Sequence, residues 1–86
     1  LLPDAAEQRY LAALRGEEQG MTRTAQVKLL EEAIVLQPGR AHYRETLAVF
    51  LFDLRRFDEA QSAIEAALGQ APRPYLRYLR GLVLCQ

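Results

Sequence analysis

The side chains of this chain that could carry chemistry are one histidine, one cysteine and several adjacent carboxylates. His42 is the sole histidine, and catalysis would require a nucleophile or a carboxylate held beside it. No serine-centred turn and no glycine-rich phosphate loop accompanies it. We therefore interpret His42 as a surface residue near a helix start, and we expect the chain not to be an enzyme.

Three pairs of carboxylates adjoin in sequence: Glu17 with Glu18, Glu31 with Glu32, and Asp58 with Glu59. Neighbours on a helix do not face each other, so these pairs are expected to be solvated helix surface. The single cysteine, Cys85, cannot form an internal disulfide, and no zinc or redox spacing surrounds it. We expect Cys85 to be a small buried apolar residue and predict no metal and no cofactor.

Size and charge restrict the function classes further. The 86 residues are enough for one small domain, 1–86. Net charge is −2 over residues 1–38 (four basic, six acidic), −1 over 39–72 (four and five) and +3 over 73–86 (three arginines, no acid). The overall field therefore gives no reason to expect nucleic acid or an acidic membrane as partner. No apolar run approaches the roughly 18 residues that span a bilayer.

The chain begins Leu1-Leu2-Pro3, without an initiator Met. This start indicates a piece of a longer protein.

Apolar residues at helical spacing, separated by prolines and glycines, predict five helices and no strand. The predicted ranges are Asp4 to about Gln19, 24–36, 40–54, Asp58 to just before Gly69, and 74–85. Gly16 falls inside the first range, so a helix that ends at Arg15 is an open alternative. The connection between the third and fourth helices is short, which makes them antiparallel neighbours.

A repeated pattern organises these helices. The apolar stripe and stop of one segment recur in a second: Leu30, Ala33, Ile34 and Pro38 match Ile64, Ala67, Leu68 and Pro72. A fixed period of this size, about 34 residues, indicates stacked copies of one helical unit. The predicted fold is therefore all-α, with antiparallel helical hairpins stacked as an α-solenoid. Such stacks form surfaces that hold another molecule.

Residues 41–74 resemble one tetratricopeptide repeat (TPR). The matching apolar, small and terminal positions are Leu47, Ala48, Leu51, Phe57, Ala60, Ile64, Ala67 and Pro72. The resemblance implies units at about 7–40 and 41–74, followed by a partial unit or capping helix over 75–86. The departures are Arg44 at an aromatic position, Gln26 at a small position, and Tyr78 and Gly81 displaced by one residue.

The resemblance also implies where a partner would bind, since TPR arrays hold peptides or helices in a concave groove lined by the first helix of each hairpin. The positions that carry over are Gln8, Leu11, Arg15, His42, Glu45, Val49, Phe52, Asp53 and Tyr78. Glu45 and Val49 stand where a carboxylate clamp would need Lys and Asn, so we predict no such clamp. Val49 and Phe52 either contact the ligand or pack against a neighbouring helix.

The expected function is protein–protein interaction or scaffolding through that groove. One alternative is an accessory segment that packs within a larger enzyme or secretion and assembly machine. Another is nucleic-acid binding through the basic, tyrosine-rich last helix, which the mildly acidic remainder disfavours. The last helix also lacks a hairpin partner, so a homodimer through it is a further expectation.

Overall fold

The structure is a computed structural model that describes residues 2–71 and 73–85. It contains five helices in chain order: α1 (Ala5–Arg15), α2 (Arg23–Leu36), α3 (Ala41–Asp53), α4 (Phe57–Gln70) and α5 (Pro74–Leu84). The described residues contain no strand, so the all-α class with five helices is confirmed. The predicted stop at Pro72 lies outside the described residues.

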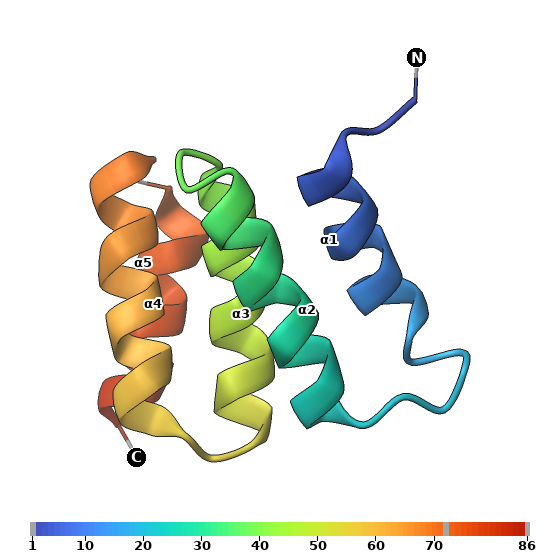
Figure 1. Ribbon diagram of the computed structural model, residues 1–86. Coiled ribbons are helices and arrows are strands. Elements are labelled where there is room, and N and C mark those ends of the chain that lie inside the picture. The colour runs from blue at the N-terminus through green and yellow to red at the C-terminus, as the bar shows by residue number, and fades with distance from the viewer. Residues whose placement is uncertain (1, 72, 86) are drawn as a thin grey trace.

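Each helix packs against the next one along the chain, and α5 also touches α3. Figure 1 shows α1 to α4 side by side in sequence order, with α5 behind α4 and α3. The molecule is flat, with extents of 37 × 27 × 18 Å. No helix among the described residues is long and apolar enough to cross a bilayer.

The helix bounds repeat along the chain. Arg23 and Phe57 begin α2 and α4, and Leu36 and Gln70 end them, so both bounds follow the period of the apolar stripes. The offset between the first residues of α3 and α5, Ala41 and Pro74, is one position shorter. The segment between α1 and α2 (16–22) is longer than the one between α3 and α4 (54–56).

Two predicted helix ends need correction. The long version of α1 is wrong and the alternative at Arg15 is confirmed, because the backbone N–H of Met21 bonds to the carbonyl of Gly16 (2.8 Å) and Gly20 has φ = 76°. A Cβ on Gly16 would lie 2.7 Å from the Met21 sulfur and 3.0 Å from the Met21 Cβ, so a larger residue there would require Met21 to shift. Gly69 lies inside α4 rather than beyond it, since α4 runs to Gln70. A single exposed glycine near a helix end costs about 1 kcal/mol, too little to stop the helix.

Side-chain caps begin the first two helices. Asp4 accepts a hydrogen bond from the backbone N–H of Glu7 (2.9 Å) and is the N-cap of α1. Thr22 does the same for the N–H of Ala25 (3.2 Å). These bonds satisfy amide donors that have no partner within the helix.

The larger of two apolar clusters joins all five helices, and its packing accounts for the buried Gln26. By the offset of α2 and α4, Ala13 and Gln26 in the first hairpin correspond to Leu47 and Ala60 in the second, and all four are buried. In the first hairpin the small residue is on α1 (Ala13) and the large one on α2 (Gln26), whereas in the second hairpin the large residue is on α3 (Leu47) and the small one on α4 (Ala60). Gln26 fills the space beside Ala13 and donates to its carbonyl oxygen (2.8 Å), so the buried amide is satisfied.

The last helix corrects one further expectation. Leu76 and Val83 are its buried residues, whereas Cys85 is exposed. Cys85 follows α5 on the side away from Leu76, because the nine positions between them correspond to about two and a half helical turns.

Candidate functional site

The nine predicted site residues lie on alternate helices. Gln8, Leu11 and Arg15 are on α1, Tyr78 is on α5, and the other five are on α3. Gln8, Arg15, Asp53 and Tyr78 are exposed, Leu11, His42, Val49 and Phe52 are half-buried, and Glu45 is buried. Whether these residues act together depends on how α1, α3 and α5 are held beside one another.

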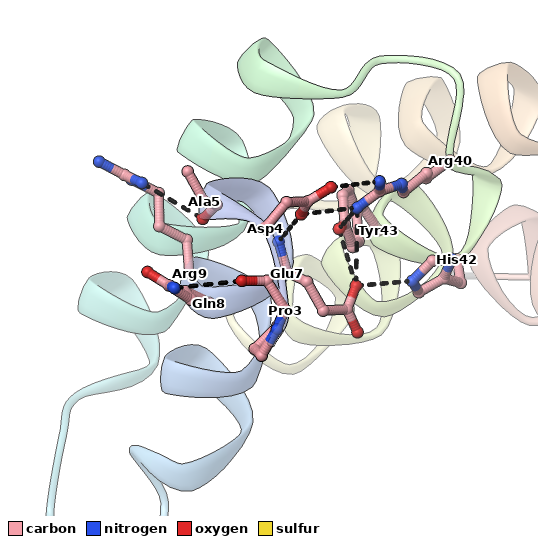
Figure 2. Close-up of polar contacts among 9 residues, drawn as sticks. All are labelled: Pro3, Asp4, Ala5, Glu7, Gln8, Arg9, Arg40, His42 and Tyr43. Atoms are coloured by element: carbon pink, nitrogen blue, oxygen red, sulfur yellow. Dashed lines mark hydrogen bonds and ion pairs between the residues drawn. The ribbon is translucent and has the colours of Figure 1, made fainter. Parts of the chain in front are cut away.

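Polar side chains join α1 to α3. Three contacts have the same sequence separation: Asp4 with Arg40, Glu7 with Tyr43, and Tyr10 with Thr46. An equal separation over three contacts means that α1 and α3 run in the same direction. Figure 2 shows the first two of these contacts at the start of both helices.

Arg40 and Asp4 form the outer end of this cluster. Arg40 donates to both carboxylate oxygens of Asp4, with Nη1–Oδ1 at 3.0 Å. The hydrogen bond from Arg40, followed by that from the Glu7 amide, lowers the pKa of Asp4 from 3.8 to about 2. The hydrogen bond to Asp4, with a smaller one to Tyr43, raises the pKa of Arg40 above its ordinary value.

Tyr43 forms the inner end. Its ring is fully buried against Ala6 and Ala33, and its hydroxyl accepts from Arg40 (2.7 Å) and donates to Glu7 (2.8 Å). Burial is the main cause that raises the pKa of Tyr43. The phenol therefore stays neutral at physiological pH, and its hydroxyl joins α1 to the start of α3 through two hydrogen bonds.

His42 sits at the edge of the same cluster. Its Nε2 is 3.6 Å from a carboxylate oxygen of Glu7, and its ring packs edge-on against Tyr10 with centroids 5.0 Å apart (Figure 2 shows His42 and Glu7). No group of three potential metal ligands gathers here or elsewhere in the described ranges. His42 is thus placed by packing on α1, at the margin of this cluster.

A charge pair joins α3 to α5. Arg73, which precedes α5, donates to Glu45 (2.7 Å). The Glu45 side chain is 11% exposed, while that of Arg73 is 54% exposed and covers it. The predicted groove residue Glu45 is therefore engaged by the start of α5 in this structure.

The remaining predicted residues on α3 are partly engaged within the fold. Phe52 packs against the core and against Phe57, with ring centroids 5.4 Å apart. Asp53 lies 3.4 Å from Arg23, whose guanidinium also stacks over the Phe50 ring at 4.3 Å. The structure thus gives Phe52 internal packing, the second of the two alternatives left open, while part of its ring stays exposed.

Sequence reasoning missed the residues that align the helices: Asp4 as an interhelical acceptor, Glu7, Arg40, Tyr43 and Arg73. Tyr43 precedes Leu47 and Leu51 at four-residue spacing, so extending the predicted stripe by one turn would have found it. The ion pairs carry no such signal, because a pair so distant in sequence depends on how the helices are stacked.

Two hollows open elsewhere on the surface. One, of about 360 Å³, lies between α2, α3 and α4, with Ile34, Leu47, Leu51 and Ala63 in its lining. The other, of about 460 Å³, lies beside α2 and includes Val35 and Leu36. None of the nine predicted residues lines either hollow.

No protein-family model, no curated protein and no solved structure matches this chain.

Proposed function

We propose that this chain is a TPR-like interaction module without catalytic activity, and that it binds an extended peptide or a helix of another protein across α1, α3 and α5. The observation that carries the proposal is the side-chain alignment of these helices: α1 is tied to α3 by Asp4 and Arg40, and α3 to α5 by Glu45 and Arg73. The regular offset of α2 and α4 supports a stacked-hairpin arrangement.

The chemistry of this face favours an apolar segment. Leu11 and Val49 are half-buried, and Tyr78 is 62% exposed, so each of the three side chains has some apolar surface that a ligand can reach. Glu45 is neutralised by Arg73, and Asp53 lies near Arg23. A ligand therefore meets little unpaired acid on α3, and apolar side chains would supply most of its affinity.

Selection from a displayed library of random peptides, followed by NMR titration of the whole chain, tests this proposal. We expect selected peptides to shift amide signals of α1, α3 and α5. Val49→Asp and Tyr78→Ala should each weaken binding by about tenfold, a step of about 1.4 kcal/mol. Val35→Asp on α2 is the matched control, because Val35 is 80% exposed and lies on another helix.

The two alternatives make different predictions for the same protein. A segment that only packs within a larger machine would yield no selected peptide that is sensitive to Val49 or Tyr78. Nucleic-acid binding would give a salt-dependent gel shift that Arg77→Glu abolishes. Two of the three arginines in 73–86 already face carboxylates, Arg73 at Glu45 (2.7 Å) and Arg80 at Glu65 (3.7 Å), which leaves a small basic footprint.

A further inference from the structure

The last helix repeats the third helix at the offset that relates Ala41 to Pro74. Arg40 and Arg73 are the N-cap residues of α3 and α5, and each forms an ion pair with a carboxylate in or just before the preceding odd-numbered helix. Tyr43 and Leu76, related by the same offset, are both completely buried. This register assigns a counterpart on α5 to each residue of α3 that α4 covers.

The counterparts differ sharply in exposure. Ala48 and Leu51 of α3 are 1% and 3% exposed, in one core cluster with Ala60 and Ile64 of α4. Their counterparts on α5 are Gly81, which is exposed, and Leu84, which is 59% exposed. The side of α5 that corresponds to the α4-covered side of α3 is therefore open.

The shape of this open side suits a second helix. A Cβ built on Gly81 would meet no atom within 4 Å outside its own helix backbone, so the space beside Gly81 is open. Small residues let helix backbones come close, as Ala48 does under α4. Leu84, one turn further along, supplies an apolar side chain of the kind that a packed helix buries.

Charge indicates what kind of helix would bind. The helix that covers α3 is acidic: α4 carries Asp58, Glu59 and Glu65 and no basic residue. Its ion pairs are made with Arg56 and with Arg80 of α5 rather than with α3, so the charge preference at α5 rests on the arginines of α5 itself. On α5, Arg77 lies on the open side, since it is two helical turns from Leu84, and it has no carboxylate partner among residues 2–71 and 73–85. A second copy of α5 and its cap would bring three more arginines and no acid, which opposes symmetric pairing of two α5 helices.

We propose that Arg77, Gly81 and Leu84 form a docking surface for an acidic amphipathic helix of another polypeptide. The helix lies antiparallel on α5, as α4 lies on α3, with a small or aliphatic residue over Gly81, apolar contact to Leu84 and a carboxylate at Arg77. This surface adjoins Tyr78 of the face proposed for peptide binding, because Gly81 lies three residues after Tyr78 on α5. It includes no residue of α1 or α3, so the amide signals of α1 distinguish the two proposals.

The probe is a helix-stapled peptide with the sequence of residues 57–70, the segment that already packs on the corresponding side of α3. Stapling removes the cost of folding the peptide on binding. NMR titration of the whole chain should shift the amides of Gly81 and Leu84 and leave those of α1 in place. Leu84→Asp should weaken binding at least about tenfold, because it places a charge against an apolar partner.

A charge exchange provides the second readout. Arg77→Glu should weaken binding of the acidic peptide several-fold and restore it for a peptide whose three acids are replaced by lysine. Val35→Asp, at an exposed valine on α2, should change neither affinity. A variant that fails to fold is identified by the loss of amide chemical-shift dispersion in its NMR spectrum. In that case, the affinities of the unmodified protein for the acidic peptide and for the lysine-substituted peptide test the proposal, and the acidic peptide should bind more tightly.

Three results would overturn the proposal. The first is the absence of any shift on α5 at about 1 mM peptide, the weak end of specific association. The second is a set of shifts on α3, which would mean that the peptide replaces the chain's own α4. The third is a dimer, in sedimentation at several concentrations, that Leu84→Asp dissociates, because Leu84 would then be covered by a second copy.

Discussion

Arg40 and Asp4, the residues that precede α3 and α1, form a two-point ion pair with N–O distances of 3.0 and 2.5 Å. Asp4 also caps α1 through the amide of Glu7 (2.9 Å). A single carboxylate therefore caps one helix and fixes the start of the next odd-numbered helix against it. Figure 2 shows how the pair closes over Tyr43, which lies beneath.

Acid should weaken this junction. The pKa of Asp4 is lowered from 3.8 to about 2 in the folded chain, so the folded state binds the proton more weakly than the unfolded state. The stabilisation is therefore complete above about pH 4 and is lost as the pH falls toward about 2. Amide exchange or NMR signals of α1 should report this loss.

Asp4→Asn is the control for the acid experiment. Asparagine is as good an N-cap as aspartate, so the helix cap remains while the ionising group is removed. The variant should lose part of the stability at neutral pH and show a flatter dependence across the acid range. An identical acid profile for both proteins would show that other carboxylates control the transition.

Tyr43→Phe should destabilise the chain by about 1–2 kcal/mol, because it removes a buried hydroxyl that joins two charged groups. The hydroxyl accepts from Arg40 and donates to Glu7, while the ring itself would still fill its site. Burial raises the pKa of Tyr43, so its contribution is present below about pH 10 and is lost as the pH rises through the folded value. Urea unfolding of both proteins at pH 7 and pH 11 should show the difference shrinking.

Gln26 and Ala13 should behave as a coupled pair. Gln26→Ala leaves a cavity and removes one of the two hydrogen bonds to the Ala13 carbonyl, which keeps the one from the Gly16 N–H (3.2 Å), so we expect a cost of about 2–3 kcal/mol. Ala13→Leu alone should overpack the site by about 1–3 kcal/mol. Together they recreate the Leu47 and Ala60 arrangement of the second hairpin, both members of which are buried.

The double variant should therefore lose less than the sum of the two single losses. Thermal or urea unfolding of the four proteins measures the coupling. Strict additivity would show that the two positions do not share one space, and that the hairpins are not equivalent at this point.

The helices were predictable from the local sequence, because the apolar residues at helical spacing and the prolines and glycines that end helices are separated by only a few residues. The bounds of α2 and α5 differ from the predicted ranges by a single position. The end of α1 was ambiguous because Gly16 is compatible with a helix, and the contact of Gly16 with Met21 is a packing fact. Gly69 was predicted to end α4, but α4 continues through it to Gln70, because a glycine is also compatible with a helix.

The site was less predictable. The positions of Gln8, Val49 and Tyr78 follow from the expected repeat, but their exposure depends on neighbours. Glu45 was expected to face a ligand and instead binds Arg73, because the start of α5 lies over α3. Cys85 was expected to be a small buried apolar residue on the apolar side of the last helix, yet it is exposed.

Gly69→Ala should stabilise the chain by about 0.5–1 kcal/mol, because alanine reduces the conformational entropy of the unfolded chain without strain in the helix. Gly69 is an exposed residue within α4, and a Cβ there would meet no atom within 4 Å. Gly16→Ala is the contrasting variant and should destabilise, because its Cβ would lie 3.0 Å from the Met21 Cβ and 3.2 Å from the Ala13 carbonyl oxygen, in addition to 2.7 Å from the Met21 sulfur. Thermal unfolding of the two variants should shift the midpoint in opposite directions.

Arg73→Ala should release α5 from α3 while leaving the other helices folded. The substitution leaves the Glu45 carboxylate, whose side chain is 11% exposed, without its cation. Because Arg73 itself is half-exposed and screened by water, the expected loss is modest, about 1–2 kcal/mol. Hydrogen exchange should accelerate at amides of α5, and less at those of α1 and α2.

Arg77→Ala is the matched control for this last experiment, since it removes the same charge from the same end of the chain. Arg77 is exposed and faces no carboxylate among the described residues, so exchange in α5 should stay within about twofold of the unmodified protein. Glu45→Gln should reproduce part of the Arg73→Ala effect, because both variants break the same pair. Equal acceleration by Arg73→Ala and Arg77→Ala would mean that helix charge, rather than the contact with Glu45, holds α5 in place.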